Sequence, residues 1–119
     1  MAEETPETPA EDAPPHLHLL LGHSLKALGH QAEAIESYRT ALKARSDFGD
    51  AYWSLANLKT YRFPDPELAC MQDALAASDE TDRVHLHFAL GKALEDRGRY
   101  EESWTHYEKG NALRRASSR

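Results

Sequence analysis

Two segments of the chain superimpose without a gap, and this repetition limits the possible folds more than any other feature. LGHSLKALGHQAEAIESY (residues 21–38) aligns with LGKALEDRGRYEESWTHY (residues 90–107). Halfway between the two segments, Leu55 and Ala56 mark a third copy, which FPDP makes one residue longer. An offset close to twice 34 residues is typical of two-helix repeats, each of which buries too little surface alone and is stabilised by stacking.

The hydrophobic spacing predicts an all-α fold of six short helices and no strand. Short turns join the helices, so we expect neighbours to pack antiparallel. The organisation predicted is a disordered acidic, Pro-rich lead (1–14), a helical domain (15–115) with repeats at about 15–48, 49–83 and 84–115, and a tail (116–119). The helices are expected at 17–28, 31–45, 51–61, 66–77, 83–97 and 100–115.

The charge distribution disfavours a nucleic-acid binder. The net charge of −6 comes mostly from the first fourteen residues, and acids and bases nearly balance elsewhere. The only basic cluster is Arg114, Arg115 and Arg119, whereas nucleic-acid binding needs a concentrated basic face. Cys70 is the single cysteine, no apolar run is long enough to span a membrane, and the acidic N-terminus is unlike a secretory signal. We therefore expect a cytoplasmic protein with no membrane partner.

Small residues stand at matching places in the copies, where they let two helices approach closely, and large residues stand opposite them. Gly22, Ala56 and Gly91 are the small residues, and Tyr38 and Tyr107 are large. In these positions the chain resembles the tetratricopeptide repeat family. The resemblance implies three repeats in a right-handed superhelical stack that binds other proteins. The middle copy departs from the family pattern at Lys59 and over FPDPELACMQ.

A closer resemblance involves AYWSLANLKTYRF and the segment from DRVHLHFALGKALEDRGRY to the end of the last helix. These segments look like the repeat region of bacterial proteins that join tetratricopeptide repeats to a C-terminal sulfotransferase domain. This chain has no Gly-rich strand–loop–helix motif for a phosphosulfate donor. The resemblance thus implies an excised repeat domain that is not itself an enzyme, and an alternative role as the scaffold of an adjoining sulfotransferase domain.

The family resemblance also implies a concave groove lined by the first helix of each repeat. Peptide-binding positions are then expected in all three repeats, at Trp53, Asn57, Phe88, Lys92, His23 and Lys26. Aromatic anchors beside an amide and lysines suit an extended peptide. A second interpretation stays open, in which Trp53 and Phe88 only pack against adjacent helices.

The best-known groove of the family holds an acidic C-terminal peptide in a basic clamp. Carried over position by position, that clamp would here be Leu19, His23, Ser54, His85 and Ala89. The basic residues are missing, so we do not expect this chain to recognise such tails.

Other kinds of site have weak support. The pairs His16/His18 and His85/His87 suggest a metal, but residues two apart on a helix do not face each other. His18 and His87 are expected to pack in the interior, and no metal, cofactor or catalytic group is expected. The last helix, with Tyr100 and Trp104, offers a surface for a homodimer.

Overall fold

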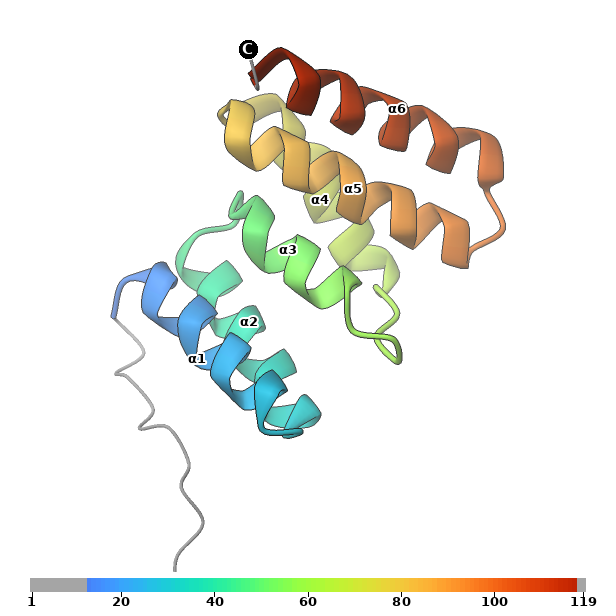
Figure 1. The fold of residues 1–119 in the computed structure, drawn as a ribbon. Helices are drawn as coiled ribbons and strands as arrows, with labels where there is room; N and C mark the ends of the chain where they lie inside the picture. Colours follow the sequence, from blue (N-terminus) through green and yellow to red (C-terminus); the bar gives the residue numbers. More distant parts are fainter. Residues whose placement is uncertain (1–12, 118–119) are drawn as a thin grey trace, which may run out of the picture. The chain divides into compact units, whose positions relative to one another are not determined.

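Each predicted helix has a counterpart in the computed structural model, which describes residues 13–117 (Figure 1). No strand occurs in that range, which confirms the all-α prediction. Most of the predicted lead and the last two residues of the tail lie outside the described residues. The helices are α1 (Pro15–Ala27), α2 (Gln31–Ala44), α3 (Gly49–Ala56), α4 (Asp65–Ala77), α5 (Glu80–Asp96) and α6 (Tyr100–Ser117).

The chain divides into two compact units, residues 1–46 and 47–119, called unit 1 and unit 2 below. The described part of unit 1 is a hairpin of α1 and α2. Gly29 ends α1 with φ +83°, and the N–H of His30 donates to the Leu25 carbonyl at 2.8 Å, which is a glycine C-cap. Tyr38 is fully buried against Gly22, where a Cβ would clash with the tyrosine ring. The stacking of this hairpin on later repeats stays a prediction.

In unit 2, α5 and α6 form a hairpin built in the same way. Gly98 has φ +76°, and the N–H of Arg99 donates to the Leu94 carbonyl at 2.9 Å. A Cβ on Gly91 would lie 2.6 Å from the Tyr107 ring, so only glycine fits there. The two turns therefore follow from one sequence pattern, a glycine directly after the C-cap residue of the helix.

The centre of unit 2 is α5, which packs against α3, α4 and α6. Its N-terminus is capped by Asp79, whose carboxylate accepts from the Asp82 N–H at 2.8 Å. The Asp82 carboxylate in turn accepts from the N–H of Gly49 at 3.1 Å and so ties the start of α3 to α5. The core side chains without solvent exposure in this unit include Leu55, Met71, Leu86, Leu90 and Leu94.

The helix predicted over residues 51–61 is wrong at its end, because α3 stops at Ala56. Beyond it, the N–H groups of Leu58 and Tyr61 bond to carbonyls three residues back, which makes tight turns. Leu58, Tyr61 and Phe63 are all buried, a spacing that one face of a helix does not provide. Residues 57–64 form a loop that fills the core with its own side chains, and we call it the aromatic loop.

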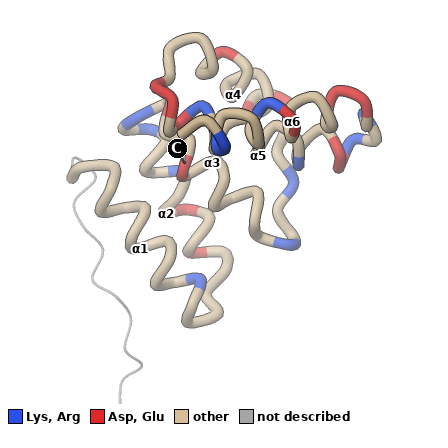
Figure 2. The backbone as a smooth tube through the Cα atoms, turned by 45° about the horizontal axis from the view of Figure 1, so that its top comes forward, with Lys and Arg blue, Asp and Glu red and all other residues tan. Residues whose placement is uncertain are grey.

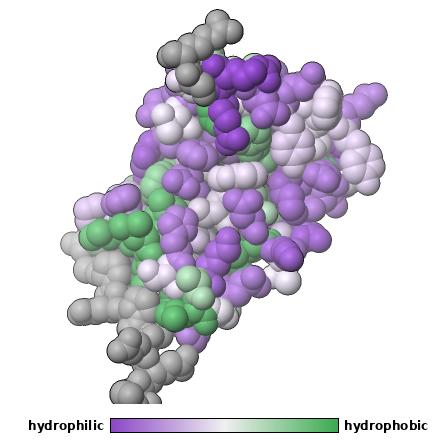
Figure 3. All heavy atoms as spheres, viewed as in Figure 1, coloured by the Kyte–Doolittle hydropathy of each residue, from purple (hydrophilic) through white to green (hydrophobic). Residues whose placement is uncertain are grey.

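Unit 1 keeps apolar side chains at its surface. Figure 3 shows hydrophobic atoms exposed around α1, where Leu17, Leu20 and Leu28 are 44%, 45% and 52% exposed. Leu17 and Leu20 lie on α1 and Leu28 is its C-cap residue, at the edge of the face that buries Leu21 and Leu25. α1 therefore presents exposed apolar side chains beside the face that it packs on α2.

Candidate functional site: the aromatic cluster around Phe88

Phe88 on α5 is the centre of an aromatic cluster in unit 2. Trp53 of α3 packs on it with ring centroids 5.5 Å apart, and Tyr107 of α6 lies at 6.4 Å. Gly110 leaves room for the ring, since a Cβ there would lie 2.9 Å from it. Phe88 is 6% exposed, whereas Trp53 is only partly buried. Of the two predicted aromatic anchors, Trp53 alone offers much surface, and Phe88 is its support.

Asn57 lies next to Trp53 and is exposed. It is the C-cap residue of α3, and its backbone N–H donates to the Trp53 carbonyl at 3.0 Å. The end of α3 therefore places Asn57 one turn beyond the tryptophan. An exposed amide carries both a hydrogen-bond donor and an acceptor, which is what an extended backbone requires.

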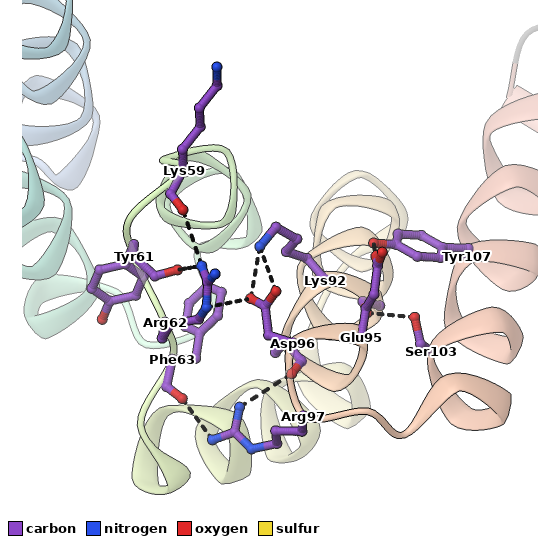
Figure 4. A network of polar contacts seen from close by, with 12 residues as sticks. Lys59, Tyr61, Arg62, Phe63, Lys92, Glu95, Asp96, Arg97, Ser103 and Tyr107 are labelled. Carbon is purple, nitrogen blue, oxygen red and sulfur yellow. Dashed lines mark hydrogen bonds and ion pairs between the residues drawn. The ribbon is translucent and has the colours of Figure 1, made fainter.

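Lys92 is more constrained than the sequence suggested. Its Nζ lies 2.8 Å from the Asp96 carboxylate one turn later on α5, and Arg62 of the aromatic loop reaches the same carboxylate at 3.8 Å (Figure 4). Arg62 also donates to the carbonyls of Lys59 and Tyr61. Asp96 thus neutralises much of the positive charge that Lys92 would present to a ligand.

His23 and Lys26 belong to unit 1 and are both exposed on α1. His23 Nδ1 lies 2.8 Å from the Tyr38 hydroxyl, and the two rings meet edge to face. Lys26 lies in the last turn of the helix, where a positive charge is favoured by the helix dipole. His23 therefore has a structural partner, and Lys26 projects from the exposed side of its helix.

Two of the histidines considered for metal binding are packing residues, as predicted. His18 is 2% exposed and His87 is 6% exposed. His87 Nδ1 lies 3.0 Å from His106 Nδ1 across the α5–α6 contact. Burial, with the neighbouring His106, lowers the pKa of His87 to about 4, and burial also lowers that of His106. The pair is therefore neutral near pH 7, with one ring donating to the other.

No group of three or more potential metal ligands occurs among residues 13–117. Charged residues of both signs are interspersed along the described backbone (Figure 2). Within the same range, no helix is long and apolar enough to cross a membrane.

Sequence reasoning gave no site role to Arg114, which lies on α6 with its guanidinium 4.6 Å from the centre of the Phe88 ring. It was counted only with the terminal basic residues. The sequence did hold an indication that Arg114 lies close to α5. Arg114 follows Gly110 by one helical turn, and Gly110 occupies a position of the repeat where two helices pack closely. Trp53 and Arg114 therefore both contact Phe88, one from α3 and the other from α6.

Comparison with known families identifies one segment of the chain. Residues 15–48, which include both helices of unit 1, match the model of the tetratricopeptide repeat. No curated protein matches the chain. The resemblance to sulfotransferase-linked repeats therefore has only the residues quoted above in its favour.

Proposed function

We propose that this chain is a non-catalytic interaction module and that it binds an extended peptide across the surface around Trp53. Tetratricopeptide repeats generally mediate contacts between proteins, and residues 15–48 are such a repeat. The observation that carries the proposal is the partial exposure of Trp53 and its contact with Phe88. Trp53 is held on a buried aromatic ring, with an exposed amide one turn away.

Tryptophan is enriched among the residues that dominate binding energy, because it buries a large area with few rotatable bonds. An anchor of this kind gains from a rigid support, since less side-chain entropy is lost on binding. Phe88 supplies that support, and Gly110 and Tyr107 hold Phe88 in turn. Asn57 would then bond to the backbone of the peptide, and Lys92 would lie at the edge of the site.

A random-peptide display selection tests the proposal, with the parent chain and a Trp53→Ala variant as baits. The expected result is a motif that is enriched on the parent and lost on the variant. Trp104→Ala is the control and should keep the motif, because Trp104 is the other tryptophan of unit 2, is more exposed than Trp53 and lies on α6. Circular dichroism should show equal helicity in all three proteins. Equal enrichment on the parent and on Trp53→Ala, or none on either, would exclude the site.

The predicted roles of His23, Lys26 and Lys92 are tested with the selected peptide. Substitution of each by alanine should weaken binding by less than the Trp53 substitution, because exposed or already paired charges contribute little. For Asn57→Ala, a loss of about 1–2 kcal/mol is expected if its amide bonds to the peptide.

A second candidate function is self-association through α6. Tyr100 and Trp104 are 69% and 65% exposed, which is unusual for such large side chains. Trp104 also lines a surface cavity of about 580 Å³ on this helix. Light scattering at rising concentration measures the molar mass directly, and a dimer that Trp104→Glu dissociates is the expected result. A monomer at every concentration would remove this candidate.

A further inference from the structure

α6 packs on α5 with one face and exposes a stripe of side chains on the opposite face (Figure 1). Ser103 and Gly110 are the buried residues of the helix and define the face toward α5. The exposed stripe, called the α6 seam below, consists of Glu101, Trp104, Glu108, Ala112 and Arg115. All of these residues except Glu101 also line the cavity of about 580 Å³ on this helix.

The α6 seam is symmetric about Glu108. Its residues follow one another at spacings of three, four, four and three positions, so the spacing is the same in both directions from Glu108. Spacings of three and four keep side chains on one face of a helix. In a dimer with a two-fold axis, residue i of one copy contacts residue j of the other, and j contacts i. A stripe with this symmetry can therefore pair with itself in antiparallel orientation.

The residue types of the α6 seam suit antiparallel pairing. Seven positions before Glu108 stands the acid Glu101, and seven positions after it stands the base Arg115. Four positions before it stands the large Trp104, and four positions after it stands the small Ala112. Antiparallel pairing about Glu108 thus places each acid beside a base and each tryptophan beside an alanine of the second copy. A parallel pair would instead bring like charges together, which is unfavourable.

Exposure and the helix dipole agree with this arrangement. Trp104 is 65% exposed, and Tyr100, one turn earlier, is 69% exposed, so burial of this face would remove two large aromatic side chains from water. Ala112 borders the same cavity as Trp104, which leaves space there for a tryptophan of the second copy. The acidic first turn and the basic last turn of α6 would lie beside each other in an antiparallel pair.

We infer that two copies of this chain associate through an antiparallel pair of α6 helices whose two-fold axis passes beside Glu108. The inference rests on self-association, the second candidate function above, and adds the orientation and register of the two copies. A single helix pair is smaller than an interface of standard size, so we expect a dissociation constant in the micromolar range. Glu108 meets its own copy at the axis, and this contact between like charges weakens the dimer.

Disulfide crosslinking tests the orientation in a Cys70→Ser background, because Cys70 is the single cysteine of the chain. Glu108→Cys should crosslink to its own copy under mild oxidation, since the two thiols meet at the axis. Glu101→Cys should not, because it lies seven residues from the axis and the two thiols would be about 20 Å apart. Lys59→Cys, at an exposed position outside α6, measures crosslinking by random collision. Efficient crosslinking by Glu101→Cys would overturn the inference.

Charge reversal tests the pairing of Glu101 with Arg115. Arg115→Glu should weaken the dimer at least about 10-fold in analytical ultracentrifugation, because the two-fold axis makes each repulsion occur twice. The double variant Glu101→Arg, Arg115→Glu should return the dissociation constant to within about 3-fold of the parent. Lys59→Glu makes the same change in charge elsewhere and should alter it less than about 2-fold. Equal weakening by the single and the double variant would refute the pairing.

Glu108→Gln should have the opposite effect. It removes the like charges at the axis and should strengthen the dimer by about 2- to 5-fold. Circular dichroism of the parent and the variant shows whether the helix content stays equal. A weaker dimer at equal helix content would mean that Glu108 pairs with a base of the second copy, and the axis would then lie elsewhere.

The outcomes distinguish failure of this inference from failure of the self-association function. A dimer that Trp104→Glu dissociates, but in which Glu101→Cys crosslinks as efficiently as Glu108→Cys, would leave self-association intact and overturn the antiparallel arrangement. A monomer at every concentration would overturn both. A dimer that crosslinks at Glu108→Cys alone and recovers in the double charge reversal would support both.

Discussion

The first and last helical hairpins are built alike, and the middle pair of helices is not. In α1–α2 and in α5–α6, a glycine of the first helix faces a tyrosine of the second, Gly22 with Tyr38 and Gly91 with Tyr107. In the middle, α3 and α4 both pack on α5, and the aromatic loop between them buries Leu58, Tyr61 and Phe63. Copies of one sequence repeat thus pack in two ways. Either the two helices of the copy contact each other closely, or side chains of the loop between them fill the core.

The difference follows from which large side chains are available. Ala56 occupies the small position of the middle copy, but α4 has no tyrosine to place opposite it. Phe63 and Tyr61 of the aromatic loop supply the aromatic side chains instead. The centroid of the Phe63 ring lies 6.4 Å from that of Tyr52 and 5.1 Å from that of Tyr61. The aromatic side chains that in the other copies lie on a second helix here come from the connection.

The largest effect on stability is expected for Phe63→Ala, which tests whether the aromatic loop is part of the core. Phe63 is 3% exposed, so truncation should lower the free energy of unfolding by about 3–5 kcal/mol, as expected for a core aromatic. Urea denaturation followed by circular dichroism measures the change. Lys59→Ala, an exposed position of the same loop, is the control and should change stability by less than about 0.5 kcal/mol. A loss below about 1 kcal/mol for Phe63→Ala would mean that the loop is only a linker.

The glycine–tyrosine contacts are tested by adding volume in both regular hairpins. Gly22→Val and Gly91→Val should each destabilise the protein by about 1–3 kcal/mol, because the new side chain meets a tyrosine ring. Ala76→Val on an exposed part of α4 controls for the lower helix propensity of valine. Thermal denaturation compares the three variants, and equal effects at all three positions would show that close approach is not what these glycines provide.

The α1–α2 and α5–α6 hairpins also differ from each other, and the pH dependence of stability should reveal the difference. His87 and His106 bond across α5–α6, and the positions aligned with them in unit 1 hold His18 and Ser37. Burial lowers the pKa of His87 to about 4, below its ordinary value of 6.5. Between these values the unfolded chain binds the extra proton, so stability is full above pH 6.5 and falls as the pH drops toward 4.

The expected loss from this residue between pH 7 and pH 5 is about 1–2 kcal/mol. Urea denaturation at the two pH values measures it. His87→Gln should reduce the dependence on pH, and His16→Gln, at an exposed position, should leave it unchanged. The same dependence in all three proteins would place the titrating group elsewhere.

The features that sequence predicted well are those set by local pattern. The helix-ending Gly29 and Gly98, the buried His18 and His87, and the all-α class follow from spacing and turn chemistry alone. The early end of α3 was missed because it depends on which side chains reach the core from residues far along the chain.

The candidate site shows the same limit. Trp53 stands out in the sequence as a large residue away from the packing stripe, and its partial exposure agrees with that interpretation. The burial of Phe88 and the approach of Arg114 depend on the register between α5 and α6, which periodicity does not define. The spacing of residues along the sequence predicts which face of a helix a residue occupies. It does not predict which other element packs against that face.

The smallest predicted effect concerns how the aromatic loop is attached to α5. Arg97 donates to the Phe63 carbonyl at 2.7 Å (Figure 4). It also donates to the Asp65 carboxylate at 2.8 Å, and its side chain is 23% exposed. Arg62 reaches Asp96 only at 3.8 Å and is 60% exposed. Arg97→Gln should therefore cost about 1 kcal/mol and Arg62→Gln less than about 0.5 kcal/mol. Urea denaturation at low and high salt separates the two, since salt screens the ion pairs of both arginines but not the bond from Arg97 to the Phe63 carbonyl, which is shielded from solvent on the Arg97 side. If Arg62→Gln proved the more damaging, the loop would depend on the Asp96 ion pairs rather than on the backbone bond, and its difference from the regular hairpins would be electrostatic instead of steric.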